Sequence, residues 1–321
     1  MSDDFHSTLP VGSELSDGAT TYQIIDPGNA GEGRGVLGQG GFGITYLAMD
    51  QRLQRRVAVK EFFPQSIVGR GHTLTVATHN KELFTALKKY FLEEARNLAK
   101  FRNPGIVDVL GFFEQNNTAY MVMPYLAGET LQDRIRQQAY SEADAKSLML
   151  ELLNILEAVH AANILHRDVK PSNIKFHETT DKPVLIDFGS ARQSEGPGLD
   201  QGTRSTFGAF SPNFSPIELN STNTRKTAAT DLYALGATIY RAMFQAGPPD
   251  STERFENESD YLPELDSAEA NKKITPEFAG VLRKCLMLRA KERYQSVSEL
   301  KSVLATASVP PESKPGDDIL S

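Results

Sequence analysis

The sequence predicts an α+β protein in which a small strand-rich part is followed by a larger helical part. Up to about residue 123, most apolar segments are short and separated by turn residues, which is typical of strands. One stretch, from Phe84 to Phe101, instead repeats apolar residues at helical spacing. After Gly128 the apolar segments lengthen and keep the helical period, as in residues 140–163.

The elements of the first part can be placed in order. Residues 1–21 are rich in Ser, Asp, Gly and Thr, and we expect them to form a tail. The amphipathic helix at 84–101 follows a loop with a small hairpin at 64–80. Strands are expected at 22–26, 45–48, 56–60, 106–114 and 118–123.

The second part is expected to be mainly helical. A buried strand is predicted at 184–186, between the long first helix and the later ones. Residues 306–321 contain three prolines and are expected to form a second tail, so the folded region should span 22–305. Helices are expected at 140–163, 228–244, 276–288 and 298–304.

Composition argues against several classes of protein. The 321 residues are 40% hydrophobic, so the chain can build a core, and the net charge of −7 does not favour nucleic acid or membrane surfaces as partners. Cys285 is the one cysteine, so an internal disulfide is excluded and we expect a buried, inert thiol. Because no signal peptide or spanning segment is visible, we expect a cytoplasmic protein, unless the chain is a piece of a longer membrane protein.

A glycine-rich motif comes between two predicted strands. Gly38, Gly40 and Gly43 have the G-x-G-x-x-G spacing, which lets backbone N–H groups approach phosphates. Alone, the motif is also compatible with a surface loop, or with a dinucleotide site if a helix follows. Here the strand at 45–48 follows, which favours a β-hairpin flap over phosphates.

Lys60 ends the apolar segment Val57-Ala58-Val59 and is a candidate phosphate ligand. A lysine at a strand end usually points to solvent, so the functional interpretation requires an acidic partner. Glu94, on the predicted helix at 84–101, stands next to the apolar Ala95 and is preferred over Glu93. Adjacent helical residues point about 100° apart, so only one of the two can face the strand.

The segment from His166 to Asn173 and the later Asp187-Phe188-Gly189 supply further chemistry. Asp168 could orient or accept the proton of an attacking hydroxyl, and Lys170 could neutralise charge on a moving phosphoryl group. Asn173 and Asp187 offer the hard oxygen ligands that Mg²⁺ prefers. Together with the glycine loop and Lys60, this order of segments predicts phosphoryl transfer.

These motifs resemble the eukaryotic-type serine/threonine protein kinases, from about Tyr22 to Leu304. The segments LGQGGFGITYLA and KEFFP are similar to bacterial members of that family. The resemblance implies a bilobal protein kinase-like fold, with an N-lobe at 22–123, a hinge at 124–128 and a C-lobe at 129–305. It also implies an enzyme that transfers the γ-phosphoryl group of Mg-ATP, or of Mn-ATP, to a Ser or Thr hydroxyl of a protein.

The resemblance assigns a role to individual residues. Lys60 and Glu94 match the ion pair that positions ATP, Asp168 matches the catalytic base beside Lys170, and Asn173 and Asp187 match the metal ligands. Met123 matches the gatekeeper before the hinge. The residues expected around the nucleotide, in addition to those just named, are Leu37, Gly38, Gly40, Gly41, Gly43, Thr45, Ala58, Met123, Pro124 and Leu126.

The resemblance also implies how the kinase is regulated. Arg167 beside Asp168 is typical of kinases activated by phosphorylation, and Thr203, Ser205 and Thr206 are candidate sites for self-phosphorylation in trans. Glu218 matches the residue that ends the activation segment, with Arg293 as its expected partner.

The chain departs from the family pattern at several positions. Ser211 stands near the position of a usual threonine, whose hydroxyl it could replace. Lys175 stands where an apolar residue usually forms the floor of the adenine pocket, and Ser172 makes a basic substrate motif less expected.

Two other functions stay open at this point. One is a pseudokinase or scaffold that binds nucleotide without turnover, although such proteins usually lack one of the residues matched here. The other is a small-molecule phosphotransferase of related fold, although Lys170 and a full activation segment are of the protein-kinase type.

Overall fold

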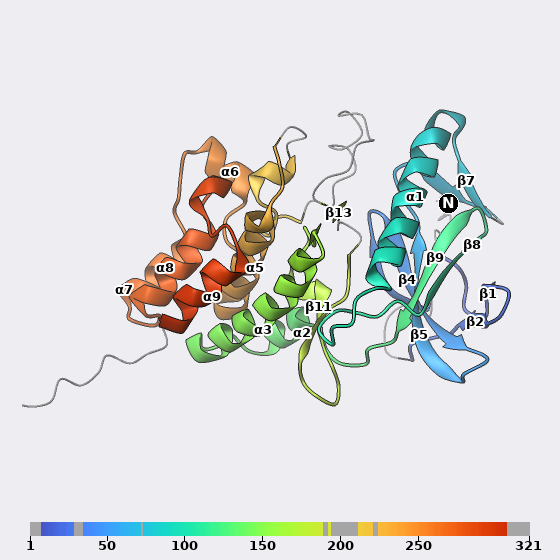
Figure 1. Cartoon of the computed structure of the whole chain (residues 1–321), viewed down its shortest axis with the longest axis horizontal. Helices are drawn as coiled ribbons and strands as arrows, with labels where there is room; N and C mark the ends of the chain where they lie inside the picture. Colours follow the sequence, from blue (N-terminus) through green and yellow to red (C-terminus); the bar gives the residue numbers. More distant parts are fainter. Residues whose placement is uncertain are drawn as a thin grey trace, which may run out of the picture. The chain divides into compact units, whose positions relative to one another are not determined.

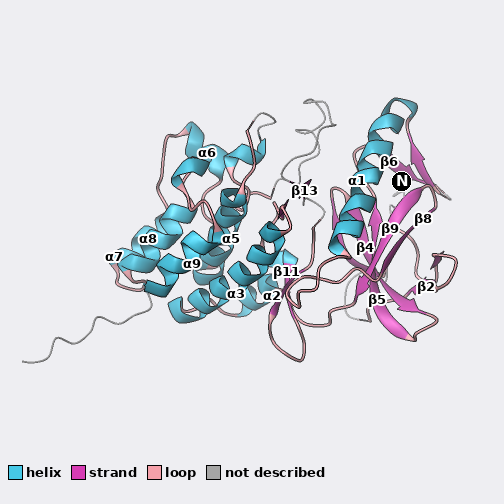
Figure 2. Cartoon of the chain, viewed as in Figure 1, coloured by secondary structure: helices cyan, strands magenta, loops and turns pink. Residues whose placement is uncertain are grey.

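The computed structural model describes residues 8–28, 35–71, 73–188, 192–193, 211–220 and 224–306 (Figure 1). The chain divides into two compact units. The first unit holds the described residues of Met1–Thr130 and Asn173–Ala209, and the second holds those of Leu131–Ser172 and Phe210–Ser321. Strands dominate the first unit and helices dominate the second (Figure 2), so the predicted α+β class is confirmed.

The first unit is built on a seven-stranded antiparallel sheet. Its strand order is β1-β2-β4-β5-β9-β8, and β3 pairs with the free part of β4. β4 and β5 are paired along their whole length, from Gly43↔Phe62 to Asp50↔Arg55. The strands are β1 (Glu14–Ser16), β2 (Thr21–Ile24), β3 (Val36–Gly40), β4 (Gly43–Asp50), β5 (Arg55–Phe62), β8 (Gly111–Gln115) and β9 (Thr118–Pro124).

Helix α1 (Lys81–Leu98) follows the short η1 (Thr78–Asn80) and packs against β8 and β9 of this sheet. The Phe62 ring lies 5.3 Å from the Phe84 ring and 5.6 Å from the Phe91 ring, centroid to centroid. Burying a phenylalanine contributes about 1.5–3 kcal/mol. The apolar residues that predicted the helix from their spacing therefore form its buried face.

A hairpin of β6 (Val68–Arg70) and β7 (Leu74–Val76) covers a buried carboxylate of β5. Glu61 is fully buried and pairs with Arg70 of the hairpin. It also accepts hydrogen bonds from the hydroxyls of Tyr46 and Tyr120, at 3.0 and 3.1 Å. Burial raises the pKa of Glu61, although Arg70 acts to lower it. The network fixes the strand that carries Lys60, which lies next to Glu61 in the chain.

The first unit differs from the predicted N-lobe at two places. Residues 14–16, expected in a tail, form β1 because they pair with β2 through Leu15↔Tyr22. The hairpin of β11 (Ile174–Phe176) and β12 (Pro183–Leu185), expected in the C-lobe, also belongs to this unit. Leu185 bonds to Gly105 and Val107, and Phe176 donates to the Glu129 carbonyl. β13 (Arg192–Gln193) is a short strand further along the chain.

The second unit is organised around α5, which is buried on nearly all sides. It packs against α2, α3, α7 and α8. A Cβ on Gly236 would lie 2.5 Å from the Cβ of Cys285, so only glycine allows α5 and α8 to approach this closely. The helices are α2 (Leu131–Gln137), α3 (Glu142–Ala161), α5 (Ala228–Phe244), α6 (Ser251–Glu256), α7 (Pro263–Ala270), α8 (Pro276–Cys285) and α9 (Val297–Thr306).

Polar caps set where these helices begin. The Ser141 hydroxyl accepts a hydrogen bond from the Asp144 amide at the start of α3. Thr227 and Thr230 form a capping box at the start of α5, which ends at the left-handed residue Gln245 (φ 56°). Short elements complete the unit: β10 (Ile164–Leu165), η3 (Ile217–Asn220) and η4 (Ala290–Glu292). The short helix η2 (Pro171–Asn173) begins in this unit, and its last residue, Asn173, belongs to the first.

Apolar segments that looked longest in the sequence are core helices. Residues Leu152, Leu156, Leu232 and Leu235 are fully buried in α3 and α5. Within the described ranges, no helix combines the length and the hydropathy needed to cross a bilayer. Cys285 is buried as predicted, and burial raises the pKa of its thiol to about 12, so it is protonated at neutral pH.

Candidate active site

Lys60 and Asp187 meet in the first unit, although they are 127 residues apart in the chain. The Lys60 ammonium donates to Asp187 Oδ1 at 2.6 Å. Lys60 is buried and held by its neighbours on both sides, pairing with Thr45 on β4 and Met121 on β9. The Asp187 side chain is 42% exposed, so the pair is open to a ligand on the aspartate side.

Glu94, the expected partner of Lys60, takes a different position. No ion pair between Lys60 and Glu94 is present, and Oε1 of Glu94 is buried without a hydrogen bond among the described residues. Burial raises the pKa of Glu94 to about 8, while the charge of Lys60 lowers it and that of Asp187 raises it further. At neutral pH the carboxyl is therefore mainly protonated, and Lys60 is paired with Asp187 instead.

This buried acid predicts how stability depends on pH. An unfolded glutamate ionises near 4.5, so between pH 4.5 and about 8 the folded state keeps a proton that the unfolded state loses. The free energy of unfolding should fall as pH rises through this window, by up to about 5 kcal/mol at about 1.4 kcal/mol for each pKa unit. We expect urea unfolding at pH 5, 7 and 9 to show this loss relative to Glu94→Gln, which cannot ionise. Identical pH profiles of the two proteins would contradict the prediction.

The glycine motif forms the turn between β3 and β4, as the flap interpretation predicted. Gly40 pairs with Gly43, and a Cβ on Gly43 would lie 2.6 Å from the Glu61 carbonyl oxygen. By contrast, a Cβ on Gly38, Gly40 or Gly41 would meet nothing within 4 Å. The turn therefore has one glycine that packing requires and three whose missing side chains leave open space.

The two predicted metal ligands come from one end of a hairpin. Asn173 immediately precedes β11 and Asp187 follows shortly after β12, and these strands pair through Ile174↔Leu185. The Ile186 amide donates to the Asn173 carbonyl at 3.0 Å, which closes this end. The backbone thus brings Asn173 and Asp187 side by side. Among the described residues no group of three or more His, Cys, Asp or Glu side chains is arranged for a metal ion.

The residues expected around adenine lie on neighbouring strands of the first unit. Ala58 on β5 is paired with Met123 on β9, and Pro124 pairs with Val57. Leu37 on β3 is partly exposed, as a residue that covers a ligand would be. The ammonium of Lys175 lies 5.9 Å from the centre of the Tyr125 ring. Lys175 is on strand β11, and Tyr125 follows strand β9 in the chain. Leu126, the last expected hinge residue, follows in the same segment.

Asp168 lies in the second unit within a compact polar triad. Its Oδ1 accepts a hydrogen bond from the Ser211 hydroxyl at 2.8 Å, and its Oδ2 pairs with the Lys170 ammonium at 2.8 Å. Lys170 also donates to Ser211 Oγ at 2.8 Å. The sequence suggested that Ser211 could supply a hydroxyl in this position, and the geometry agrees.

Asp231 holds the backbone that leads to Asp168. Its carboxylate accepts the amides of His166 and Arg167, at 2.9 and 2.7 Å, and contacts Nε2 of His160 at 2.7 Å. Burial alone would raise the pKa of Asp231, but the hydrogen bond from His160 and the other contacts hold it below its ordinary value. Arg167 has the unusual φ of 64°, which these contacts stabilise.

Glu218 and Arg293 form the predicted pair in a buried, bidentate arrangement. The two guanidinium nitrogens lie 2.6 and 3.0 Å from the two carboxylate oxygens. Arg293 also donates to the carbonyls of Met287 and Leu288. The pair joins η3 to the segment before α9.

Several predicted residues lie outside the described part of the chain. They are Gly189 and the three candidate phosphorylation sites Thr203, Ser205 and Thr206. Ser215 was missed by the sequence analysis, although its Oγ accepts the Ser211 amide at 3.0 Å. A lone serine in a polar segment gives no signal of such a contact.

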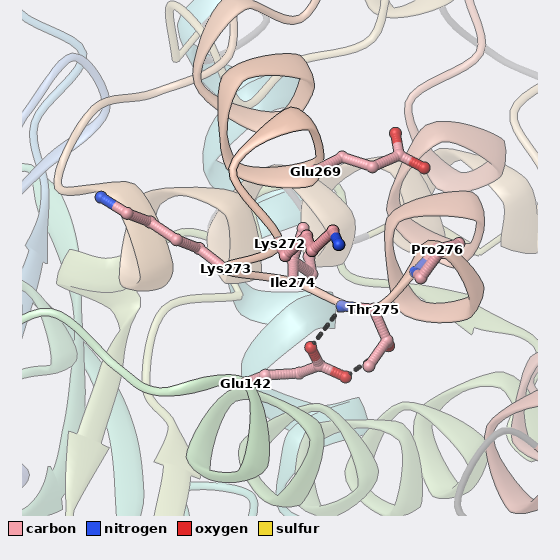
Figure 3. Close-up of a pocket in the computed structure, with 7 residues that line it drawn as sticks. All are labelled: Glu142, Glu269, Lys272, Lys273, Ile274, Thr275 and Pro276. Carbon is pink, nitrogen blue, oxygen red and sulfur yellow. Dashed lines mark hydrogen bonds between the residues drawn. The ribbon is translucent and has the colours of Figure 1, made fainter.

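A separate hollow of about 390 Å³ lies in the second unit (Figure 3). Glu142, at the start of α3, accepts hydrogen bonds there from the amide and hydroxyl of Thr275. Lys272, Lys273 and Glu269 line the same hollow. None of the residues predicted to act in catalysis lines it, so it is not part of the candidate active site.

Comparison with known proteins gives one consistent family. The profile of the protein kinase domain matches residues 32–304. Serine/threonine-protein kinase B of Synechocystis sp. is 29% identical over 280 residues, which are 84% of this chain and 45% of that protein. Serine/threonine-protein kinase PknA of Nostoc sp. is 30% identical over 285 residues, which are 86% and 47% of the two chains.

Solved structures show the same fold. The structure described as PpkA-294 apo form has a TM-score of 0.73 and 31% identity, and the match covers 93% of this chain and 99% of that one. The kinase domain of Mycobacterium tuberculosis PknI has a TM-score of 0.63 at 19% identity, over 94% and 100% of the two chains, and shows the fold alone. The present chain spans about half the length of the curated relatives it matches.

Proposed function

Since the chain belongs to the protein kinase family, we propose that it transfers the γ-phosphoryl group of Mg-ATP to Ser or Thr hydroxyls of proteins. The observation that carries the proposal is the Asp168–Lys170–Ser211 triad, in which a carboxylate already holds a serine hydroxyl at 2.8 Å. This is the contact that a general base needs with the hydroxyl it activates. The names of the bacterial relatives support Ser/Thr as the acceptor class.

The first unit has features that suit a metal-bound nucleotide. The open space at Gly38, Gly40 and Gly41 would admit phosphates close to the backbone. Asn173 and Asp187 would hold Mg²⁺ or Mn²⁺, which usually takes only one or two protein ligands beside phosphate oxygens. When bound, the metal supplies charge neutralisation on the phosphates.

A metal ion held by Asp187 would also change the surroundings of Lys60 and Glu94. Asp187 would hold the metal with the same carboxylate that the Lys60 ammonium contacts. Lys60 could then turn from Asp187 to phosphate oxygens, and Glu94 could ionise beside it. The Oε1 atom of Glu94, which is buried without a hydrogen bond, would then gain the Lys60 ammonium as its partner.

In the second unit, side chains would position the acceptor hydroxyl and take up its proton. Asp168 would orient the acceptor hydroxyl and take its proton as the oxygen attacks phosphorus. Lys170 would offset the negative charge that builds up on the transferred group. Ser211 holds the side chains of Asp168 and Lys170 in position, because its hydroxyl donates to Asp168 and accepts from Lys170.

We further propose that the chain phosphorylates itself in trans at Thr203, Ser205 or Thr206. Arg167 lies beside Asp168, and a phosphate brings about −1.5 to −2 charges that an arginine can bind. Mass spectrometry of purified protein treated with Mg-ATP should find phosphate on at least one of these three residues. An active enzyme in which all three are unmodified would refute the proposal.

One assay separates this function from its alternatives. Wild type and Asp168→Ala are incubated with Mg²⁺ and ATP labelled on the γ-phosphate, together with a protein acceptor and, separately, small alcohols. Label on protein with wild type alone supports the proposal. Bound nucleotide without label would point to a pseudokinase, and label on a small alcohol would point to a small-molecule phosphotransferase.

A further inference from the structure

Helix α6 (Ser251–Glu256) belongs to the second unit (Figure 1). This helix and the turn after it carry exposed aromatic and acidic side chains. Phe255 and Tyr261 are 56% and 62% exposed, which is unusual for residues of this size. Four exposed carboxylates share the stretch with them. We call these six residues the α6 surface: Glu253, Phe255, Glu256, Glu258, Asp260 and Tyr261.

Polar contacts of the neighbouring residues fix the backbone beside Phe255 and Tyr261. The Ser259 amide donates to the Arg254 carbonyl at 2.9 Å, so the chain turns back after α6. The Arg254 guanidinium then contacts Asp260 at 3.4 Å and donates to the Leu286 carbonyl at 2.9 Å. Phe255 and Tyr261 each follow one member of the Arg254–Asp260 pair in the chain. These contacts fix the backbone next to Phe255 and next to Tyr261.

The charge of the α6 surface has one sign. From 251 to 261 all residues are described, and the one basic side chain among them, Arg254, is only 3% exposed. Asp260 is paired with the buried Arg254, and the other three carboxylates face solvent without an exposed cation in this stretch. Aromatic faces beside carboxylates attract Lys and Arg through both cation–π and ionic contacts, and they also pack on aliphatic side chains.

Hydrogen bonds connect α6 to the candidate base within the same unit. The Ser251 hydroxyl, at the first residue of α6, donates to the Ser215 carbonyl at 2.8 Å. Ser215 accepts from the Ser211 amide, and Ser211 donates to Asp168. Phe255 lies four residues beyond Ser251, or about 6 Å along a helix. The helix that carries the α6 surface is therefore linked to the candidate base through Ser215 and Ser211.

We propose that the α6 surface docks a basic segment of the protein substrate, with an aliphatic side chain against Phe255 and Tyr261. This inference rests on the proposed kinase function. The segment would lie apart from the phosphorylated residue, so it adds affinity without touching the reacting atoms.

The charge of residues 1–7 and 307–321 argues against either segment as the ligand of the α6 surface. Residues 1–7 contain two aspartates and no Lys or Arg, and residues 307–321 contain three acidic residues and one lysine. Either end would be repelled by the four carboxylates. A second copy that used the same surface would be repelled for the same reason.

The test compares two substrates with the full chain and saturating Mg-ATP. One is a peptide pool with a central serine and randomised neighbours. The other is the same pool joined through a Gly/Ser linker to the docking segment Lys-Arg-Leu-Lys-Leu-Arg. We expect KM for the joined pool to be about tenfold lower in wild type. Phe255→Ser/Tyr261→Ser should lose this gain, with kcat and activity on the plain pool unchanged.

Two matched controls test specificity. Leu53→Ser removes an equally exposed apolar side chain from the first unit, and it should keep the tenfold gain. Glu256→Lys should reduce the gain, whereas Glu277→Lys, an exposed charge on α8, should not.

Equal KM values for the two pools, or an undiminished gain in the double variant, would overturn the docking proposal. If neither pool is labelled, the kinase function fails, and fluorescence anisotropy of the labelled docking segment decides instead. Binding to wild type but not to the double variant would then support the surface, and equal binding would overturn it. A dimer in sedimentation that the double variant abolishes would assign the surface to a second copy and overturn the substrate assignment.

Discussion

Replacing Asp168 with alanine is expected to lower the turnover number for phosphoryl transfer by roughly 10²–10⁴-fold, the usual contribution of a general base. This corresponds to roughly 2.7–5.4 kcal/mol of transition-state stabilisation. The reason is local: the variant would remove the carboxylate that holds a hydroxyl at 2.8 Å. It would also leave the Lys170 ammonium without the carboxylate that orients it.

Initial rates at saturating Mg-ATP and protein acceptor measure this effect. Asp168→Asn keeps the size of the side chain and should be almost as slow, because an amide does not accept the proton. Asp108→Ala, which removes an exposed carboxylate of the first unit, should keep the wild-type rate. If Asp168→Ala kept a turnover number within threefold of wild type, Asp168 would not be the base.

Replacing Arg293 with methionine is expected to lower the free energy of unfolding by about 3–5 kcal/mol, as breaking a buried ion pair usually does. Arg293 is 1% exposed and Glu218 is 5% exposed, so the variant would leave a carboxylate buried without its cation. The carbonyls of Met287 and Leu288 would lose their donor as well.

Urea unfolding monitored by circular dichroism measures this loss. Glu218→Gln combined with Arg293→Met should recover part of it, because no charge then remains buried and unpaired. Arg289→Met breaks an exposed pair with Glu292 and should change stability by less than about 1 kcal/mol. A loss below 1 kcal/mol for Arg293→Met itself would show that the pair does not hold this part of the unit together.

Long periodic segments were predictable from the sequence, and short polar ones were not. The pattern at 228–244 matched α5 at both ends, and that at 84–101 found α1 within a few residues. β1 was missed because three residues, Glu14–Ser16, are too few to show alternation. α6 and α7 were missed because their polar sequences give little apolar periodicity, and their start depends on the Asp250 cap and on a proline.

The residues of the candidate site could be predicted where the order of motifs identifies them. The ion pairs among them could not be predicted, because they depend on which carboxylates are ionised. Asp168, Lys170, Asn173 and Asp187 could be named as candidates because their order and spacing resemble the motifs of protein kinases. The pairing of Lys60 with Asp187 could not be predicted, because the choice between two carboxylates depends on burial and on the charge of a ligand. The contact of His160 with Asp231 depends on packing between α3 and α5, which sequence spacing does not reveal.

The most direct test of the account follows the transferred phosphate to its acceptor. Wild type and Lys60→Met are incubated with Mg²⁺, ATP labelled on the γ-phosphate and a protein acceptor, and the labelled protein is hydrolysed to amino acids. Phosphoserine or phosphothreonine is expected from wild type, only when Mg²⁺ is present, and almost none is expected from a folded Lys60→Met variant. Undiminished label from Lys60→Met, or nucleotide bound by wild type with no labelled Ser or Thr, would contradict it.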